Sequence, residues 1–144
     1  MNVDVRTEVL IRRPVAEVAA YAADPDHAPD WYVNISSVEW CTPRPLAVGT
    51  RVAFVAQFLG RRIAYTYEIA ELVPGERLVM GTAEGPFPMR TTYTWEAAEG
   101  GTRMTLRNSG APSGFGALTA PLMAAAMRRA NRKDLAALTS ILEA

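Results

Sequence analysis

Hydrophobic and polar positions alternate along most of the chain, and the period changes to that of a helix only near its end. Residues 3–11 alternate valine, threonine and isoleucine with charged side chains, which predicts a half-buried strand. Pro14 then opens a short helix, and Asp24 and Pro25 end it before a second short helix or turn that finishes near Asn34. Further strands are predicted at 36–42, 50–59, 62–73, 76–83, 89–97 and 102–109.

The last predicted element is one long amphipathic helix over residues 117–144, with Pro121 in its first turn. At about 100° per residue, its apolar stripe is about 120° wide and contains Met123, Met127, Leu135, Leu138, Ile141 and Leu142. Asn131 lies near the centre of this stripe and Asp134 at one margin. A buried amide needs hydrogen-bond partners, so it suits a helix that lines a pocket better than one that closes an apolar core. The pattern therefore predicts a cavity against this face.

Two hairpins can be assigned a register from their turns. Gly60 and Arg61 suit a two-residue turn with glycine first, which would pair Phe58 with Ile63, Ala56 with Tyr65, and Phe54 with Tyr67. A second turn around residues 99–101 would pair polar residues on the outer face: Glu96 with Arg103, Thr94 with Thr105, and Thr92 with Arg107. The inner face of this hairpin would then pair Trp95 with Met104, Tyr93 with Leu106, and Thr91 with Asn108.

The predicted inner face of the sheet combines bulky apolar residues with many polar groups. Such a mixture is typical of a small-molecule site, which we expect to measure about 300–1,000 Å³. The alternative is that individual tyrosines reach the edge of the sheet with their hydroxyls in water. Two helix residues complete the predicted ligand-binding set, which comprises Phe54, Phe58, Tyr65, Tyr67, Met80, Thr82, Thr91, Tyr93, Trp95, Asn108, Met127 and Asn131.

Composition narrows the class of protein. Residues 1–144 are long enough for one domain with a sizeable core, and 49% of them are hydrophobic and 21% charged, as in a folded globular domain. The 15 Lys and Arg residues balance 15 Asp and Glu residues, which argues against nucleic acid as a partner. The one basic cluster is best explained as a solvated helix face and consists of Arg128, Arg129, Arg132 and Lys133.

Metal and covalent chemistry find little support in the sequence. Cys41 is the only cysteine and His27 the only histidine, so an internal disulfide and a usual zinc site are both excluded, and we expect no metal or cofactor.

The N-terminal segment has no apolar stretch of the kind found in signal peptides, and no run approaches the ~18 apolar residues of a membrane span. The expectation is a cytoplasmic protein without integral membrane association.

The order of these elements resembles the START-like (SRPBCC) superfamily, in its polyketide cyclase/dehydrase and lipid transport branch. Four segments carry the resemblance, at residues 11–32, 67–80, 91–106 and 128–143. It implies an α+β helix-grip fold in which a seven-stranded antiparallel sheet, ordered 1-7-6-5-4-3-2, wraps around the C-terminal helix. Two short helices after the first strand would close one end, where we expect Trp31 to be buried. Loops at 59–62, 84–88 and 109–116 would ring the mouth, with Phe87 and Phe115 as candidate lips.

The same resemblance leaves three classes of function open. Cyclases of this superfamily promote aldol condensation, which needs a general acid or base and a group that stabilises an enolate oxygen. Inward-facing donors are plentiful, but Asp134 is the only inward carboxylate, a weak catalytic candidate. We therefore expect a carrier or sensor, monomeric or homodimeric, that binds a hydrophobic or amphipathic small molecule such as a lipid, polyketide or isoprenoid-like compound. A polyketide cyclase/aromatase is the alternative. A protein-interaction or co-chaperone role ranks third, because the predicted outer faces show no large apolar patch.

Overall fold

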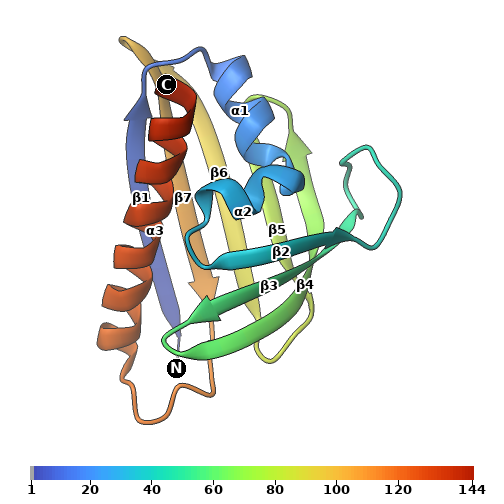
Figure 1. Ribbon diagram of the computed structural model, residues 1–144, viewed down its shortest axis with the longest axis vertical. Helices are drawn as coiled ribbons and strands as arrows, with labels where there is room; N and C mark the ends of the chain where they lie inside the picture. The colour runs from blue at the N-terminus through green and yellow to red at the C-terminus, as the bar shows by residue number, and fades with distance from the viewer. Residues whose placement is uncertain (1) are drawn as a thin grey trace.

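The computed structural model describes residues 2–144, in which a seven-stranded antiparallel sheet curls around one long helix (Figure 1). The strands are β1 (Val3–Ile11), β2 (Ile35–Trp40), β3 (Arg51–Phe58), β4 (Arg61–Val73), β5 (Arg77–Glu84), β6 (Met89–Ala98) and β7 (Gly101–Gly110). The helical elements are α1 (Val15–Ala23), the 3-10 turn η1 (Pro25–His27), α2 (Ala28–Trp31) and α3 (Ala120–Glu143). The sheet order β1-β7-β6-β5-β4-β3-β2 confirms the predicted helix-grip fold.

Local sequence explains where the first elements begin and end. In β1, buried Val3 and Val5 alternate with exposed Asp4 and Arg6, because successive side chains of a strand point to opposite faces of the sheet. Pro14 is the N-cap residue of α1, and its backbone is extended, so the helix begins at the next residue. The break between α1 and η1 also has a local cause. Asp24 caps η1, because its side chain accepts a hydrogen bond from the backbone N–H of Asp26.

The β6–β7 hairpin has the predicted register, but the β3–β4 hairpin does not. The β3–β4 turn consists of Leu59 and Gly60, with φ of 51° and 76°, so that Phe58 pairs with Arg61. The observed pairs are therefore Ala56 with Ile63, Phe54 with Tyr65, and Val52 with Tyr67. Two positive φ angles characterise the turn whose twist best matches the flanking strands. The predicted register was wrong by two residues, and a shift of two leaves every side chain on its predicted face.

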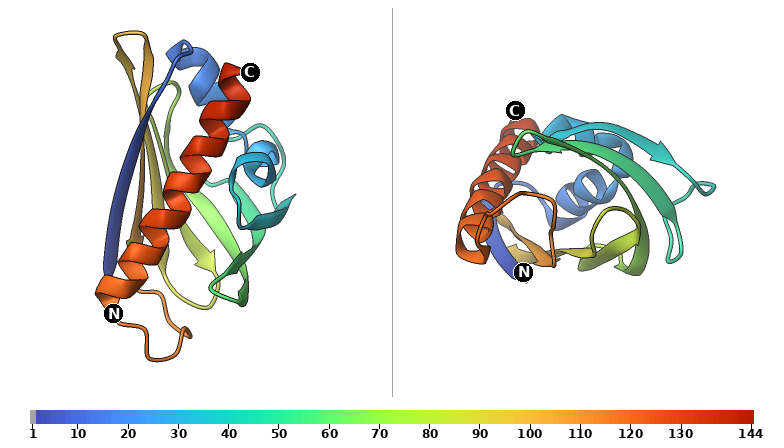
Figure 2. Two further views of the ribbon diagram at one scale, coloured as in Figure 1. Left: turned by 60° about the vertical axis from the view of Figure 1, so that its left-hand side comes forward. Right: turned by 90° about the horizontal axis from the view of Figure 1, so that it is seen from below.

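Helix α3 lies across the concave side of the sheet and packs against β1 (Figure 2). It begins at Ala120 rather than at residue 117, with Pro121 in its first turn. Ile141 departs from the predicted stripe, since 37% of it is exposed. Asn131, predicted at the centre of the stripe, and Asp134, predicted at its margin, are both buried. The other buried residues of the stripe are Met123, Met127, Leu135, Leu138 and Leu142.

The two ends of the grip differ. At one end, α1 and α2 cover the sheet, and Trp31 is only 1% exposed, which confirms its predicted burial. Its indole packs against the Tyr32 and Tyr93 rings, with centroids 4.2 and 5.7 Å away. At the other end lie the β3–β4 turn, the β5–β6 loop and the β7–α3 connection (Figure 2, right). Neither α1 nor α2 covers the sheet at this end, which is formed by loops.

Candidate ligand-binding cavity

A cavity of about 170 Å³ lies between the sheet and α3. All the predicted ligand-binding residues line it except Trp95, which is buried in the core beside Tyr93. The volume is below the predicted range because aromatic rings occupy much of the concave face. The centroids of Tyr65 and Tyr67 are 4.9 Å apart, and those of Phe54 and Tyr65 are 5.6 Å apart. An apolar cavity of about 150 Å³ is large enough for benzene, so a cavity of this size suits a compact ring system.

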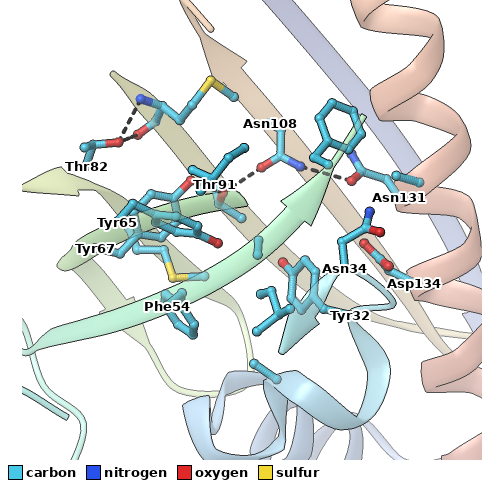
Figure 3. A pocket seen from close by; sticks show the side chains of 18 of the residues that line it. Tyr32, Asn34, Phe54, Tyr65, Tyr67, Thr82, Thr91, Asn108, Asn131 and Asp134 are labelled. Atoms are coloured by element: carbon cyan, nitrogen blue, oxygen red, sulfur yellow. Dashed lines mark hydrogen bonds between the residues drawn. The ribbon is translucent and has the colours of Figure 1, made fainter. Parts of the chain in front are cut away.

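A chain of hydrogen bonds crosses the cavity wall from the sheet to α3 (Figure 3). The Thr91 hydroxyl donates its one proton to Asn108 Oδ1 at 2.6 Å, so the bond of 3.1 Å between Tyr67 and Thr91 must be donated by Tyr67. Asn108 Nδ2 in turn donates to Asn131 Oδ1 at 3.2 Å. Every bond therefore runs in one direction, and the chain ends at a donor, Asn131 Nδ2.

Asn131 Nδ2 is buried and has no hydrogen-bond partner. In the described part of the chain, the other buried side-chain nitrogens without a partner belong to Trp31 and Trp95, neither of which lines the cavity. A buried donor left unpaired costs about 1–3 kcal/mol. An acceptor atom of a ligand, such as a carbonyl oxygen, would remove this cost.

Asp134 follows Asn131 by one turn of α3 and also lines the cavity. The carboxyl group is 3% exposed, and its Oδ1 accepts a hydrogen bond of 2.9 Å from the Val33 backbone N–H. Burial raises the pKa of Asp134 to about 7, because removal from water disfavours the charged form, while the bond from Val33 acts in the opposite direction. Both protonation states are therefore populated near neutral pH, as general acid–base chemistry requires.

Tyrosine hydroxyls add neutral polar groups to the wall. Tyr32 and Tyr93 share a hydrogen bond between their hydroxyls, and burial raises the pKa of both well above the ordinary value. Burial also raises the pKa of Tyr67 to about 12 and that of Tyr65 well above its usual range. All four phenols are therefore protonated at physiological pH. Tyr32 and Asn34 belong to the wall but were missed, because the sequence pattern does not fix the orientation of so short a helix.

Aromatic residues of the mouth loops form the outer part of the wall. Phe87 and Phe115, the predicted lips, both line the cavity, and their ring centroids are 5.9 Å apart. The Phe115 ring also contacts Phe58 of β3, with centroids separated by 5.8 Å in an edge-to-face arrangement. Three rings from three different segments therefore lie together on this part of the wall.

Residues 2–144 contain no group of three or more His, Cys, Asp or Glu side chains placed to hold a metal ion. Nor does any helix within these residues have the length and apolar character needed to cross a membrane.

Comparisons with known proteins identify the same fold in solved structures. No curated protein matches the chain. Among solved structures, a START superfamily protein from Mycobacterium smegmatis has a TM-score of 0.83 at 9% identity, over 97% of each chain. The Zhui aromatase/cyclase from Streptomyces sp. R1128 has a TM-score of 0.80 at 19% identity, over 99% of this chain and 94% of that one. Ginseng major latex-like protein 151 from Panax ginseng has a TM-score of 0.76 at 12% identity, over 98% and 97%.

These structural similarities establish the fold alone, and the family follows from the sequence. The family model described as polyketide cyclase/dehydrase and lipid transport matches residues 2–143. The match covers the sheet, both short helices and α3, and so includes every element that lines the cavity. The chain is a member of the polyketide cyclase/dehydrase and lipid transport family.

Proposed function

We propose that the protein binds a compact, amphipathic small molecule in this cavity, as a carrier or sensor. The observation that carries the proposal is the unpartnered Asn131 Nδ2 in a wall that is otherwise mostly apolar. The apolar body of the ligand would lie against Phe54, Tyr65 and Met80, while a carbonyl or hydroxyl oxygen accepts the bond from Asn131. Lipid-derived, polyketide and isoprenoid-like molecules all combine these features.

The proposal also covers the domain organisation, cellular location and oligomeric state of the protein. Residues 1–144 act as one helix-grip domain, in the cytoplasm, as a monomer or homodimer. The balance of 15 basic and 15 acidic residues supports a role without nucleic acid.

A matched pair of ligands tests the role of Asn131. 2-Acetylnaphthalene carries a ketone, and 2-isopropylnaphthalene has nearly the same shape without an acceptor. Asn131→Leu should weaken binding of the ketone by roughly 5- to 150-fold, the factor that corresponds to about 1–3 kcal/mol, and leave the hydrocarbon nearly unaffected. Titration calorimetry with both ligands and both proteins measures this difference. Equal losses for the two ligands, or no binding of either ligand by the unmodified protein, would contradict the proposal.

A catalytic function is the second candidate, and the buried Asp134 favours it. Asn131 and Asp134 are three residues apart on α3 and therefore lie on the same side of the helix. The Asp134 carboxylate would remove a proton from the carbon next to a carbonyl, and Asn131 would donate to the enolate oxygen that forms. Intramolecular attack of such an enolate on a second carbonyl is the bond-forming step of an aldol cyclisation.

Proton exchange at the acetyl group tests this candidate without knowledge of the natural substrate. In D₂O, the protein should accelerate deuterium incorporation into the methyl group of 2-acetylnaphthalene, as followed by proton NMR. Asp134→Asn should abolish the acceleration while leaving affinity for the ketone nearly unchanged, because only a transition-state interaction is lost. Exchange that is no faster with the protein than without it would exclude this chemistry and leave binding as the function.

A further inference from the structure

One arginine side chain connects three segments around the mouth of the cavity. Arg61 is the first residue of β4, directly after the β3–β4 turn, and its Nη1 donates a hydrogen bond to the Ser113 carbonyl in the β7–α3 connection. The guanidinium carbon lies 5.3 Å from the centroid of the Phe115 ring and 5.9 Å from that of Phe87, which belongs to the β5–β6 loop. These distances lie within the range of cation–π attraction. Arg61 therefore contacts all three segments that surround the opening.

The β7–α3 connection is shaped around this side chain. Gly114 has a φ of +85°, and a Cβ atom at this position would collide with Arg61 Nη1. Gly116 also has a positive φ, +68°, but a Cβ atom there would have no neighbour within 4 Å. The glycine at 114 thus serves two purposes, backbone conformation and close approach to Arg61, whereas the glycine at 116 serves only the first.

Within the part of the chain that the structure describes, Arg61 is held in place without an ion pair. The side chain is partly exposed, and no acidic group of residues 2–144 forms an ion pair with it. It is held instead by one backbone carbonyl and two ring faces. Phe87 and Phe115 also line the cavity, so Arg61 contacts two residues of its wall. Figure 2 shows the β7–α3 connection arching across this end of the molecule.

We propose that Arg61 is a positioning residue that controls how fast a ligand enters and leaves the cavity, by holding the Phe87 and Phe115 rings together across the mouth. This inference rests on the proposed binding function. It predicts a specific kinetic signature, because a barrier at the mouth affects association and dissociation equally. Loss of the arginine should change both rates and leave the equilibrium affinity almost unchanged.

Stopped-flow fluorescence with 2-acetylnaphthalene tests the kinetic signature. Arg61→Ala should raise both the association and the dissociation rate constants about tenfold, the factor that corresponds to about 1.4 kcal/mol. Arg61→Lys should lie between Ala and the unmodified protein, since lysine keeps the charge but loses the planar guanidinium. Arg62→Ala removes the neighbouring exposed arginine and is the matched control, with rates expected to be unchanged. Equal rates in Arg61→Ala and the unmodified protein would overturn the proposal.

The two glycines supply a second matched pair. Gly114→Ala should displace the guanidinium and reproduce the faster exchange of Arg61→Ala, although Arg61 itself is intact. Gly116→Ala imposes a similar backbone strain without touching Arg61, so its rates should stay near those of the unmodified protein. Acceleration by both substitutions to the same extent would show that loop strain, rather than displacement of Arg61, sets the rate.

Hydrogen–deuterium exchange separates failure of this inference from failure of the binding function, because it needs no ligand. Backbone amides of residues 111–119 should exchange faster in Arg61→Ala than in Arg62→Ala. If 2-acetylnaphthalene does not bind, the binding function is contradicted, and the amide measurement alone decides whether Arg61 holds the connection. Unchanged exchange in this segment would overturn the role of Arg61.

Discussion

Replacement of Asp134 by asparagine should stabilise the protein, and the gain should grow with pH. Asparagine keeps the Oδ1 acceptor that bonds to the Val33 backbone N–H but cannot ionise. In the folded protein, burial raises the pKa of Asp134 from 3.8 to about 7. The folded state therefore retains a proton that the unfolded state releases near pH 4.

The magnitude follows from this difference of about three pH units. Between about pH 4 and pH 7 the folded state binds more protons than the unfolded state at this site, so stability falls as the pH rises. Each unit corresponds to about 1.4 kcal/mol, which gives about 4 kcal/mol in total, reached once the pH exceeds the folded pKa. The Asp134→Asn variant does not lose this stability, because asparagine does not ionise. Its advantage should be smallest near pH 4 and approach about 4 kcal/mol at pH 8, or roughly 10 °C in melting temperature.

The difference between the two proteins isolates Asp134 from the other carboxyl groups. Hydrogen bonds from Arg107 and Arg44 lower the pKa values of Asp4 and Asp26, and these groups destabilise the fold as the pH falls. They are present in both proteins, so their contributions cancel. Urea unfolding at several pH values from 4.5 to 8, followed by tryptophan fluorescence, gives the two curves. A difference that does not change with pH would refute the argument, since it would mean that Asp134 is hydrated and titrates normally.

Two further predictions concern stability alone. Trp31→Ala should lower the free energy of unfolding by about 3–5 kcal/mol, because the indole is 1% exposed at the closed end of the grip; an unchanged urea midpoint would contradict this. Leu59→Asn should raise the free energy of unfolding by about 1 kcal/mol, because Leu59 has a φ of 51° and a 53% exposed side chain, and asparagine tolerates this conformation better. A decrease would show that contacts of the leucine side chain outweigh its backbone strain.

The two hairpins show what hydrophobic alternation determines and what it leaves open. Alternation identifies the face of each residue, and the inner faces of both hairpins were predicted correctly. Register depends on the turn, and a single glycine can occupy either position of a two-residue turn. No local pattern indicates that the leucine before Gly60 adopts a positive φ, as it does in the structure. The β6–β7 turn contains Glu99 and Gly100 between already well-defined strands, and its register was predicted correctly.

For the cavity, too, the sequence pattern predicts which face a residue lies on but not its position along the strand. Helical periodicity placed Asn131 at the centre of the buried face, and inward alternation placed every predicted strand residue except Trp95 on the cavity wall. Alternation does not tell how far along a strand a side chain lies. Trp95 faces inward, but the cavity does not extend to its position on β6, a strand that α1 also contacts. The pairing of Tyr32 with Tyr93 depends on how α2 is set against the sheet, which no short-range pattern specifies.

The position of α3 in the chain has a consequence for synthesis on the ribosome. Helix α3 follows all seven strands, and its last turn is tied to the residues after β1 by bonds from the Arg12 backbone N–H to Glu143 and from Arg13 Nε to the Leu142 carbonyl. Until α3 has emerged, the part of the concave apolar surface that α1 and α2 do not cover has no partner, and nascent chains with such a surface are prone to aggregation. The interval between completion of β7 and emergence of α3 is therefore the stage at which a chaperone that covers apolar surface would protect this chain most.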